Sequence, residues 1–283
     1  MGLRPLISTG ELAQRLSDPQ LRIVDLRWRL GQPGSGRELY GAGHIPGAIH
    51  LDVDTDLAAR SGPGRHPLPT PEACAARLGQ AGIGDEHLVV VYDDLGGSIA
   101  ARLWWMLCWL GHDQVALLDG GITRWQAEGR PLAAELPNFT PARFTARPRP
   151  EMLVDCDAVE RLRRQAGALI LDARAAERYR GELEPIDPRA GHIPGAANAP
   201  YQENLAGPSD PRFRAAEALG QRYRSLGADR AQTIVCYCGS GVTACHDLLA
   251  LELAGVRGAK LYPGSWSDWS ADPSRPIATG AEP

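Results

Sequence analysis

Residues 232–251, QTIVCYCGSGVTACHDLLAL, repeat the layout of residues 88–107, LVVVYDDLGGSIAARLWWML. Each stretch opens with an apolar run, passes through a loop of small residues with glycines, and continues into a longer apolar segment. The first run has the length of a buried β-strand, and the last has the length of a helix. One strand–loop–helix unit is therefore predicted to occur twice in the chain.

Three further pairs of segments keep the same order in the two halves. IVDLRW (23–28) recurs as ILDARA (170–175), GHIPGAIHLD (43–52) as GHIPGAANAP (191–200), and LLDGGITRW (117–125) as LYPGSWSDW (261–269). Because the spacing between partners stays between 144 and 148 residues, the sequence predicts two tandem domains of similar fold. The seam is expected in the proline-rich stretch LPNFTPARFTARPRP (136–150), which has no helical period.

The predicted organisation is an N-terminal domain at 1–137, a linker at 138–150 and a C-terminal domain at 151–283. β-branched runs predict buried parallel strands, which are Leu21–Asp25, Leu88–Tyr92, Ala116–Leu118, Ala168–Asp172, Thr233–Tyr237 and Ala259–Tyr262. Helices are predicted at Ala100–Leu110 and Thr243–Ala254. The alternation indicates an α/β fold, with a mostly parallel sheet flanked by helices in each domain.

The bulk composition argues against several classes of function. A chain of 283 residues with 43% hydrophobic residues and a net charge of −4 predicts a folded protein without general attraction to nucleic acid or membranes. No apolar run reaches the roughly 20 residues needed to cross a bilayer, and the first residues lack a secretory pattern. The six cysteines do not have the spacing of a disulfide framework, so we expect a cytoplasmic protein.

Cys238 stands where a predicted strand passes into the loop CGSGVT (238–243). Gly239 and Gly241 permit a sharp turn in which successive N–H groups converge on an anion, assisted by the positive end of the following helix. A sulfur at the centre of such a loop is stabilised as the nucleophilic thiolate. The residues alone therefore predict an activated cysteine in an anion-binding loop, at the strand ends where α/β sheets carry their sites.

Other interpretations of Cys238 fit the sequence less well. A buried structural cysteine needs no glycine-rich loop. A zinc site at Cys236, Cys238 and residues 245–246 lacks the usual ligand spacings, so no metal is expected, and Cys236 and Cys245 are interpreted as packing residues. Cysteine phosphatases need an arginine six positions after the cysteine, and Ala244 stands there.

The tandem halves, the two GHIPGA segments, the CGSGVT loop and the closing YPGSWSDW resemble the two-domain rhodanese-type sulfurtransferases over roughly residues 6–280. The resemblance implies two tandem rhodanese-like domains, with the nucleophile in the C-terminal one only. Asp94 occupies the position of Cys238 in the first half, so the N-terminal domain is expected to be catalytically silent. The histidines of GHIPGA, His44 and His192, are interpreted as parts of a turn.

The resemblance also implies which residues surround Cys238. Ser240 matches a serine that relays a proton, Asp54 matches its acidic partner, and His66 matches a histidine near that pair; Asp52 competes with Asp54 for this role. The remaining loop residues expected to bind substrate are Gly239, Gly241, Val242 and Thr243.

Two arginines are expected to bind the carboxylate of the sulfur donor. Arg178 matches the first of them. The stretch ERYRGELEPIDPRAGHIPG (177–195) is two residues shorter than the family pattern, so the second arginine is assigned to Arg189 as the nearest candidate, with Arg180 as the alternative.

The expected reaction is a two-step sulfur transfer through a persulfide on Cys238, without a metal or an organic cofactor. The uncharged loop favours 3-mercaptopyruvate over thiosulfate as the donor. The acceptor is expected to be cyanide, a small thiol or a thioredoxin-like protein. Two alternatives stay open: a thiosulfate-specific rhodanese, and a protein sulfur-relay module with little turnover of small donors.

Overall fold

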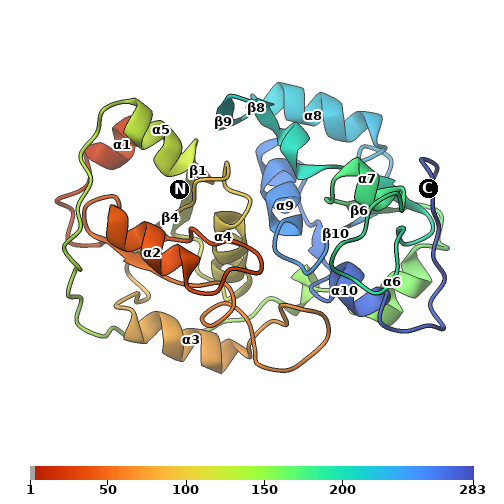
Figure 1. Cartoon of the computed structure of the whole chain (residues 1–283), viewed down its shortest axis with the longest axis horizontal. Helices are drawn as coiled ribbons and strands as arrows, with labels where there is room; N and C mark the ends of the chain where they lie inside the picture. The colour runs from red at the N-terminus through yellow and green to blue at the C-terminus, as the bar shows by residue number, and fades with distance from the viewer. Residues whose placement is uncertain (1–3) are drawn as a thin grey trace. The chain divides into compact units, whose positions relative to one another are not determined.

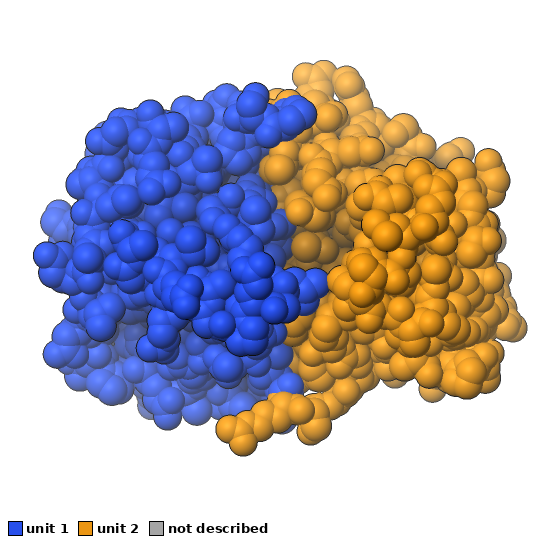
Figure 2. Space-filling model, in the orientation of Figure 1, with its two compact units in different colours: residues 1–59, 69–149, 207–213 blue, residues 60–68, 150–206, 214–283 orange. Residues whose placement is uncertain are grey.

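The computed structural model describes residues 4–283, which form two compact units (Figures 1 and 2). Of these residues, unit 1 holds those up to 59 together with 69–149 and 207–213, and unit 2 holds 60–68, 150–206 and 214–283. Each unit therefore includes a short segment from the other half of the sequence. The boundaries 1–137, 138–150 and 151–283 stay a prediction, although residues 136–149 contain no helix or strand.

Unit 1 is built on a sheet of five parallel strands (Figure 1). Their order is β1-β5-β4-β2-β3, and their bounds are β1 Leu6–Ile7, β2 Leu21–Asp25, β3 Ala48–His50, β4 Leu88–Tyr92 and β5 Val115–Leu118. The predicted strands at β2 and β4 have the bounds expected from their β-branched runs. β5 begins one residue earlier than predicted.

Helices cover both faces of this sheet. They are α1 (Thr9–Ala13), α2 (Ser35–Ala42), α3 (Pro71–Gln80), α4 (Ala100–Trp109) and α5 (Gly121–Ala127). Leu12, Tyr40 and Trp125 from α1, α2 and α5 join one buried cluster with alternate strand residues such as Val90. α4 packs against β4 and β5, and it ends one residue before its predicted end.

Unit 2 repeats this plan with four parallel strands in the order β11-β10-β6-β7. The strands are β6 Ala168–Asp172, β7 Ala196–Asn198, β10 Thr233–Tyr237 and β11 Lys260–Leu261. The α-helices are α6 Cys156–Leu162, α7 Ala176–Tyr179, α8 Ala216–Ser225, α9 Ala244–Leu253 and α10 Ser265–Trp269. Unit 2 also contains two short 3-10 helices, Pro150–Met152 and Tyr201–Asn204. The strands β8 (Leu205–Gly207) and β9 (Asp210–Phe213) form a separate two-stranded sheet, of which residues 207–213 belong to unit 1. β6 and β10 have the predicted bounds, whereas β11 and α9 are each shorter by one residue at both ends.

A buried ion pair recurs at the end of the same strand in both units. Arg27 contacts Asp25 at 2.6 Å, and Arg174 contacts Asp172 at 2.6 Å. In each pair the arginine also donates to the carbonyl oxygen of the glycine that opens GHIPGA, at 2.7 Å. Each guanidinium thus ties a strand end to the following turn, and its desolvation is offset by several charge-assisted hydrogen bonds.

The histidines of the GHIPGA segments have matching structural contacts. His44 stacks on Tyr40 and His192 on Tyr179, with ring centroids 3.9 and 3.7 Å apart. The Nδ1 atom of each histidine lies 2.9 or 2.8 Å from the carbonyl oxygen of the same tyrosine. These contacts give both histidines a place in the turn, in agreement with the interpretation from the sequence.

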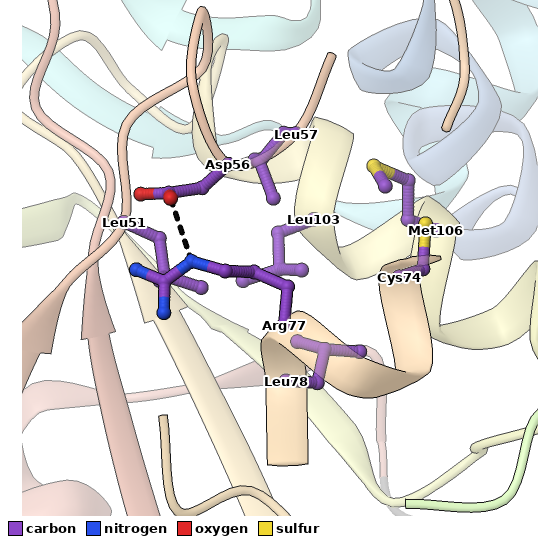
Figure 3. Close-up of a pocket in the computed structure, with 8 residues that line it drawn as sticks. All are labelled: Leu51, Asp56, Leu57, Cys74, Arg77, Leu78, Leu103 and Met106. Atoms are coloured by element: carbon purple, nitrogen blue, oxygen red, sulfur yellow. Dashed lines mark hydrogen bonds and ion pairs between the residues drawn. The ribbon is translucent and has the colours of Figure 1, made fainter. Parts of the chain in front are cut away.

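A small apolar cavity lies beside α3 and α4 in unit 1 (Figure 3). Its volume is about 10 Å³, and its lining residues are Leu51, Asp56, Leu57, Cys74, Arg77, Leu78, Leu103 and Met106. Such a volume holds at most one water molecule. Burial raises the pKa of the Cys74 thiol to about 11, so the thiol stays protonated at neutral pH. The cavity offers neither room for a substrate nor a nucleophile.

Among residues 4–283, no helix combines the length and the apolar character needed to cross a membrane.

A buried polar cluster lies on α9 of unit 2. The Asp247 side chain is fully buried, and its Oδ1 accepts hydrogen bonds from Asn204 Nδ2 at 2.7 Å and from Tyr223 Oη at 3.2 Å. Burial raises the pKa of Asp247 to about 7, against the opposing effects of Arg222 and these hydrogen bonds. The folded state therefore favours the protonated carboxyl over a range of pH in which the unfolded chain has lost that proton.

Asp247→Asn is expected to flatten the dependence of stability on pH. Because the pKa is raised on folding, its contribution is fully present near pH 4 and is lost as the pH rises through about 7. The wild type should lose roughly 2–4 kcal/mol of unfolding free energy between pH 4 and 8 through this group, and Asp247→Asn should lose that component. Urea denaturation at several pH values measures it, with the exposed Asp229→Asn as the control. Identical pH profiles for the wild type and Asp247→Asn would contradict the assignment.

Candidate functional site

Cys238 directly follows β10, which lies between β11 and β6 in the sheet of unit 2. Residues 238–243 form the loop that joins β10 to α9. The Cys238 side chain is 1% exposed. The cysteine thus lies beyond the carboxyl end of an inner parallel strand, where α/β sheets place their functional groups.

The backbone of this loop is held by the segment around the start of α10. Cys238 N donates to Ser265 Oγ at 3.1 Å, and the Cys238 carbonyl oxygen accepts from Trp266 N at 2.9 Å. The Gly239 carbonyl oxygen accepts from Ser267 N, also at 2.9 Å. The segment YPGSWSDW therefore fixes the backbone around Cys238. The sequence did not predict this role for it.

Ser265 has an uncommon backbone conformation for a residue with a side chain. Its φ is 55°, and among residues 4–283 it alone of the non-glycine residues has a positive φ. Its hydroxyl donates to the Tyr262 carbonyl oxygen at 2.9 Å while it accepts from Cys238 N. Two buried hydrogen bonds beside Cys238 thus offset the free-energy cost of the strained Ser265 backbone. No sequence signal beyond the repeat itself indicated this residue.

The loop presents backbone donors that have no partner within the protein. In the part of the chain that the structure describes, the N–H groups of Gly239, Ser240, Val242 and Thr243 donate to no protein acceptor. Thr243, the N-cap of α9, makes no side-chain cap hydrogen bond. Unmet donors beside the positive end of a helix are the features of an anion site.

In the matching loop of unit 1, between β4 and α4, a carboxylate of the protein itself accepts the backbone hydrogen bonds. The Asp93 side chain is fully buried, and its two carboxylate oxygens accept four backbone hydrogen bonds of 2.8 Å, from Leu95, Gly97, Ile99 and Ala100.

Tyr92 lies opposite Asp25 in the sheet of unit 1 as Tyr237 lies opposite Asp172 in the sheet of unit 2, so Asp93 and Cys238 hold the same position directly after the strand. Their carbonyl oxygens accept from Ile122 N and Trp266 N, which are themselves repeat partners. Unit 2 therefore has a thiol where unit 1 has a carboxylate, and the expectation that Asp94 matches Cys238 is wrong by one residue.

Ser240 and His66 are brought together within unit 2. Ser240 Oγ lies 2.7 Å from His66 Nδ1, and both side chains are buried. His66 belongs to the segment 60–68, which forms part of this unit. The two side chains are therefore in hydrogen-bond contact two residues after Cys238, and their role in moving a proton stays a prediction.

Asp54 and Asp52 lie in unit 1. Asp54 Oδ2 accepts from Trp28 Nε1 at 2.8 Å. Asp52 Oδ1 accepts from the N–H groups of Asp54 and Thr55 at 2.9 and 3.1 Å, which gives Asp52 a local turn-forming role. The role of Asp54 as the acidic partner of Ser240, with Asp52 as its competitor, stays a prediction.

Arg178 lies against the loop. A side-chain carbon placed on Gly239 would lie 3.4 Å from Arg178 Nη1. Its Nη2 pairs with Glu184 Oε1 at 2.6 Å and with Asp187 Oδ2 at 3.1 Å. The guanidinium is thus positioned next to the residue that follows the nucleophile.

Arg189 is placed differently from the prediction. Its guanidinium donates to four backbone carbonyl oxygens at the end of α10 and beyond it: Trp269 (3.1 Å), Ser270 (2.8 Å), Arg275 (3.0 Å) and Asp272. All three of its nitrogens are engaged in holding the C-terminal end of α10 and the turn that follows. The assignment of Arg189 as the second donor-binding arginine is therefore wrong. Arg180, the alternative, pairs with Glu182 at 2.7 Å.

Arg65 is a neighbour of the loop that the sequence analysis missed. A side-chain carbon on Gly239 would lie 3.1 Å from Arg65 Nη2. Its backbone N–H donates to Ser267 Oγ at 3.0 Å, and its Nη1 pairs with Asp187 Oδ1 at 2.7 Å. The only signal for it in the sequence was its place directly before His66.

The remaining cysteines near the loop have structural surroundings. Cys236 is fully buried, and burial raises the pKa of its thiol well above the usual range. Cys245 Sγ donates to the Gly241 carbonyl oxygen at 3.4 Å. Throughout residues 4–283, no group of three or more His, Cys, Asp or Glu side chains is arranged to hold a metal ion.

Gly241→Ala is expected to disrupt the loop. Gly241 has a φ of +74°, and a side-chain carbon there would lie 2.5 Å from the Pro263 carbonyl oxygen. The change should lower the free energy of unfolding by roughly 2–3 kcal/mol and alter the rate at which iodoacetamide alkylates Cys238. Gly255→Ala is the matched control, since Gly255 has a φ of +80° but no atom within 4 Å of that position, and it should cost only about 1 kcal/mol. Equal costs in urea denaturation would contradict the steric argument.

Comparison with known proteins adds independent findings. The family model for the rhodanese-like domain matches residues 8–128 and again residues 155–272. A Pseudomonas aeruginosa protein named probable 3-mercaptopyruvate sulfurtransferase is 47% identical over 285 residues, which cover 99% of this chain and 100% of the relative. A Mycobacterium tuberculosis protein, provisionally named thiosulfate sulfurtransferase SseB, is 39% identical over 97% of both chains. The crystal structure of SseA from Escherichia coli superposes on this chain with a TM-score of 0.83 at 33% identity. The match covers 94% of this chain and 100% of SseA, which is described as a 3-mercaptopyruvate sulfotransferase with the rhodanese fold.

Proposed function

This chain belongs to the rhodanese family, and on that premise we propose that it is a sulfurtransferase that carries sulfur as a persulfide on Cys238. The observation that carries the proposal is the contrast between the two loops. The Asp93 carboxylate accepts hydrogen bonds from the loop of unit 1, whereas four N–H groups of the Cys238 loop donate to no protein acceptor among the described residues. Sulfur chains on a cysteine are anionic at neutral pH, and the loop amides would stabilise them.

The first step loads the cysteine. The Cys238 thiolate attacks the thiol sulfur of 3-mercaptopyruvate, so that an S–S bond forms and the C–S bond of the donor breaks. The electron pair of that bond leaves with the three-carbon fragment as pyruvate enolate. The enolate then takes the persulfide proton, which leaves pyruvate and the Cys238 persulfide anion.

Ser240 and His66 are proposed to move that proton. Their 2.7 Å hydrogen bond is made within unit 2, and both groups are shielded from solvent. Asp54 is proposed as the acidic partner that orients them. A positioned acid–base group of this kind contributes roughly 10²–10⁴-fold to a rate.

The second step unloads the cysteine. A nucleophilic acceptor attacks the outer sulfur, so that the S–S bond breaks and the Cys238 thiolate is restored. With cyanide the product is thiocyanate. We propose a small thiol or a thioredoxin-like protein as the acceptor in the cell, and the cytoplasm as its location.

The choice of donor follows from the charge of the loop. None of the residues 238–243 has a basic side chain, so the loop alone gives no preference for a dianion such as thiosulfate. The names of the relatives include both donors. We propose 3-mercaptopyruvate as the preferred donor and thiosulfate as a weaker one.

Unit 1 is proposed to be catalytically silent. Asp93, at the position of Cys238, carries a carboxylate instead of a thiol, and Asp94 pairs with Arg29 through two contacts of 3.0 and 2.5 Å. Its loop donors are already engaged by Asp93. Neither a nucleophile nor an open anion site is left in this loop.

Cys238→Ser should abolish sulfur transfer. Thiocyanate formation from cyanide is measured with 3-mercaptopyruvate and with thiosulfate, and mass spectrometry of the loaded wild type should find one added sulfur atom on Cys238. Cys245→Ser is the matched control, because it changes a buried thiol near the same loop, and it should retain most of the activity. Sulfur on another cysteine, or turnover in Cys238→Ser, would refute the proposal. Slow turnover that one acceptor protein accelerates would favour the sulfur-relay alternative.

Ser240→Ala should separate the two donors. Loss of the Ser240–His66 route should lower kcat with 3-mercaptopyruvate by roughly 10- to 100-fold, since the enolate needs a proton. Thiosulfate releases sulfite, which needs none, so its kcat should fall much less. Steady-state rates with both donors test this, and equal losses would assign Ser240 a role in shaping the loop only.

A further inference from the structure

A large cavity lies in unit 2, and none of the residues 238–243 lines it. Its volume is about 430 Å³, which falls in the range of roughly 300–1,000 Å³ that small-molecule sites occupy. It lies between the residues that lead into α6 and the turn that joins β11 to α10, and every residue that lines it belongs to unit 2. The cavity therefore has the size of a ligand site and is separate from the Cys238 loop.

Much of the cavity wall is apolar and held firmly by the backbone. Leu153 pairs with Leu261 in a parallel bridge, and Val154 N donates to the Leu261 carbonyl oxygen at 3.0 Å. These bonds hold the segment before α6 against the edge strand β11, so the cavity is preformed in the fold. Its apolar lining residues are Pro63, Leu153, Val154, Tyr262 and Pro263.

The polar part of the wall is acidic. It contains three carboxylates and one guanidinium, so its formal charge is −2: Asp155, Asp157, Asp268 and Arg275. Cys156 also lines the cavity, and burial raises the pKa of its thiol, so the thiol adds no charge at neutral pH. An excess of negative charge beside an apolar wall favours a cation with an apolar part.

The protein uses only one oxygen of each of these carboxylates. Asp268 Oδ2 accepts from Tyr262 Oη at 2.6 Å, and Asp157 Oδ1 pairs with Arg275 at 2.6 Å. Asp155 Oδ1 caps the start of α6. Among residues 4–283, the second oxygen of each carboxylate accepts no hydrogen bond from a protein donor. These oxygens are acceptors for an ammonium group, which has three N–H donors.

The arrangement of the acids favours an organic cation over a metal ion. The described chain has no group of three or more His, Cys, Asp or Glu side chains that are arranged to hold a metal ion, and these acids are therefore too widely spaced to coordinate one. An organic amine places its charge near the acids and its carbon skeleton against the apolar wall. We propose that this cavity is a second ligand site of the protein and that it binds an organic ammonium ion with an apolar body.

The cavity shares a wall with the structure that supports the Cys238 loop. Pro263 lines the cavity, and its carbonyl oxygen faces Gly241, where a side-chain carbon would lie 2.5 Å from it. The adjoining residues 265–267 hold the backbone of the loop through their hydrogen bonds. A ligand that binds the folded wall slows its local opening, so its effect should extend to residues 238–243.

Calorimetric titration with a matched pair of compounds tests the charge preference of the site. Tryptamine is a cation at neutral pH, whereas tryptophol has the same ring and chain with a neutral hydroxyl. The full-length protein should bind tryptamine roughly 10-fold more tightly than tryptophol, because only the amine makes charge-assisted hydrogen bonds. Equal affinities for the two compounds, or no binding of tryptamine at millimolar concentration, would overturn the proposal. Neither measurement depends on sulfur transfer.

Substitutions in the wall test where the amine binds. Asp155→Asn keeps the helix cap and removes a charge, so it should weaken tryptamine binding by on the order of 3- to 10-fold. Arg275→Gln removes the guanidinium of the wall and should tighten binding, which provides a variant with the opposite effect if Asp155→Asn does not fold. Asp229→Asn, at an exposed position of the same unit outside the cavity, is the control. Equal losses in Asp155→Asn and Asp229→Asn would contradict the site.

Cys156 measures occupancy of the cavity directly. Its side chain is half-buried in the wall, so saturating tryptamine should slow its alkylation by iodoacetamide several-fold, as followed by mass spectrometry. The half-buried Cys108 of unit 1 is the reference thiol, and its rate should not change. Alkylation of Cys156 at an unchanged rate would place the amine elsewhere and overturn the proposal.

Hydrogen exchange tests the connection between the cavity and the loop. Bound tryptamine should slow amide exchange several-fold in residues 262–268, which include part of the wall, and also in residues 238–243. Slower exchange in residues 262–268 alone would support the site and contradict its connection to the loop. Unchanged exchange in both segments would contradict binding in this cavity.

Discussion

The backbone N–H groups that converge where an inner strand passes into a helix set the main constraint on this protein. Such donors must be satisfied, because unmet buried donors cost free energy. In unit 1 the Asp93 carboxylate accepts from four of them. In unit 2 the same position after the strand is held by Cys238, which brings no carboxylate. One of the two loops therefore contains its own anion, and the other does not.

This constraint explains why neighbouring residues hold the backbone of the Cys238 loop. A loop that keeps its donors free cannot use them to hold its own shape, so its carbonyl groups and its first N–H are held from outside. Ser265, Trp266 and Ser267 supply those bonds, and Ser265 adopts a left-handed backbone to do so. Gly241 has a positive φ, and a side-chain carbon there would lie 2.5 Å from the Pro263 carbonyl oxygen, so this position of the loop requires glycine. Rigidity of this kind preorganises the donors for a developing negative charge.

Local patterns in the sequence were sufficient to predict the fold. The strands at β2, β4, β6 and β10 have their predicted bounds, because a continuous β-branched run specifies a buried parallel strand locally. Arg189 was misassigned because its position in a motif says nothing about which carbonyl groups its side chain reaches. Arg65 was missed for the converse reason: its neighbours in space come from segments more than 100 residues away, and only the folded chain brings them together.

The placement of residues 60–68 has a consequence for how the two copies are related. These nine residues come from the first half of the sequence, yet they pack as part of unit 2 and bring His66 to Ser240. The reactive unit is therefore not a contiguous piece of the chain. A gene fragment that encoded only the second copy would keep the sulfur nucleophile and lose the histidine and the arginine beside it. The chain holds two similar modules, and residues 60–68 of the first half are part of the second module.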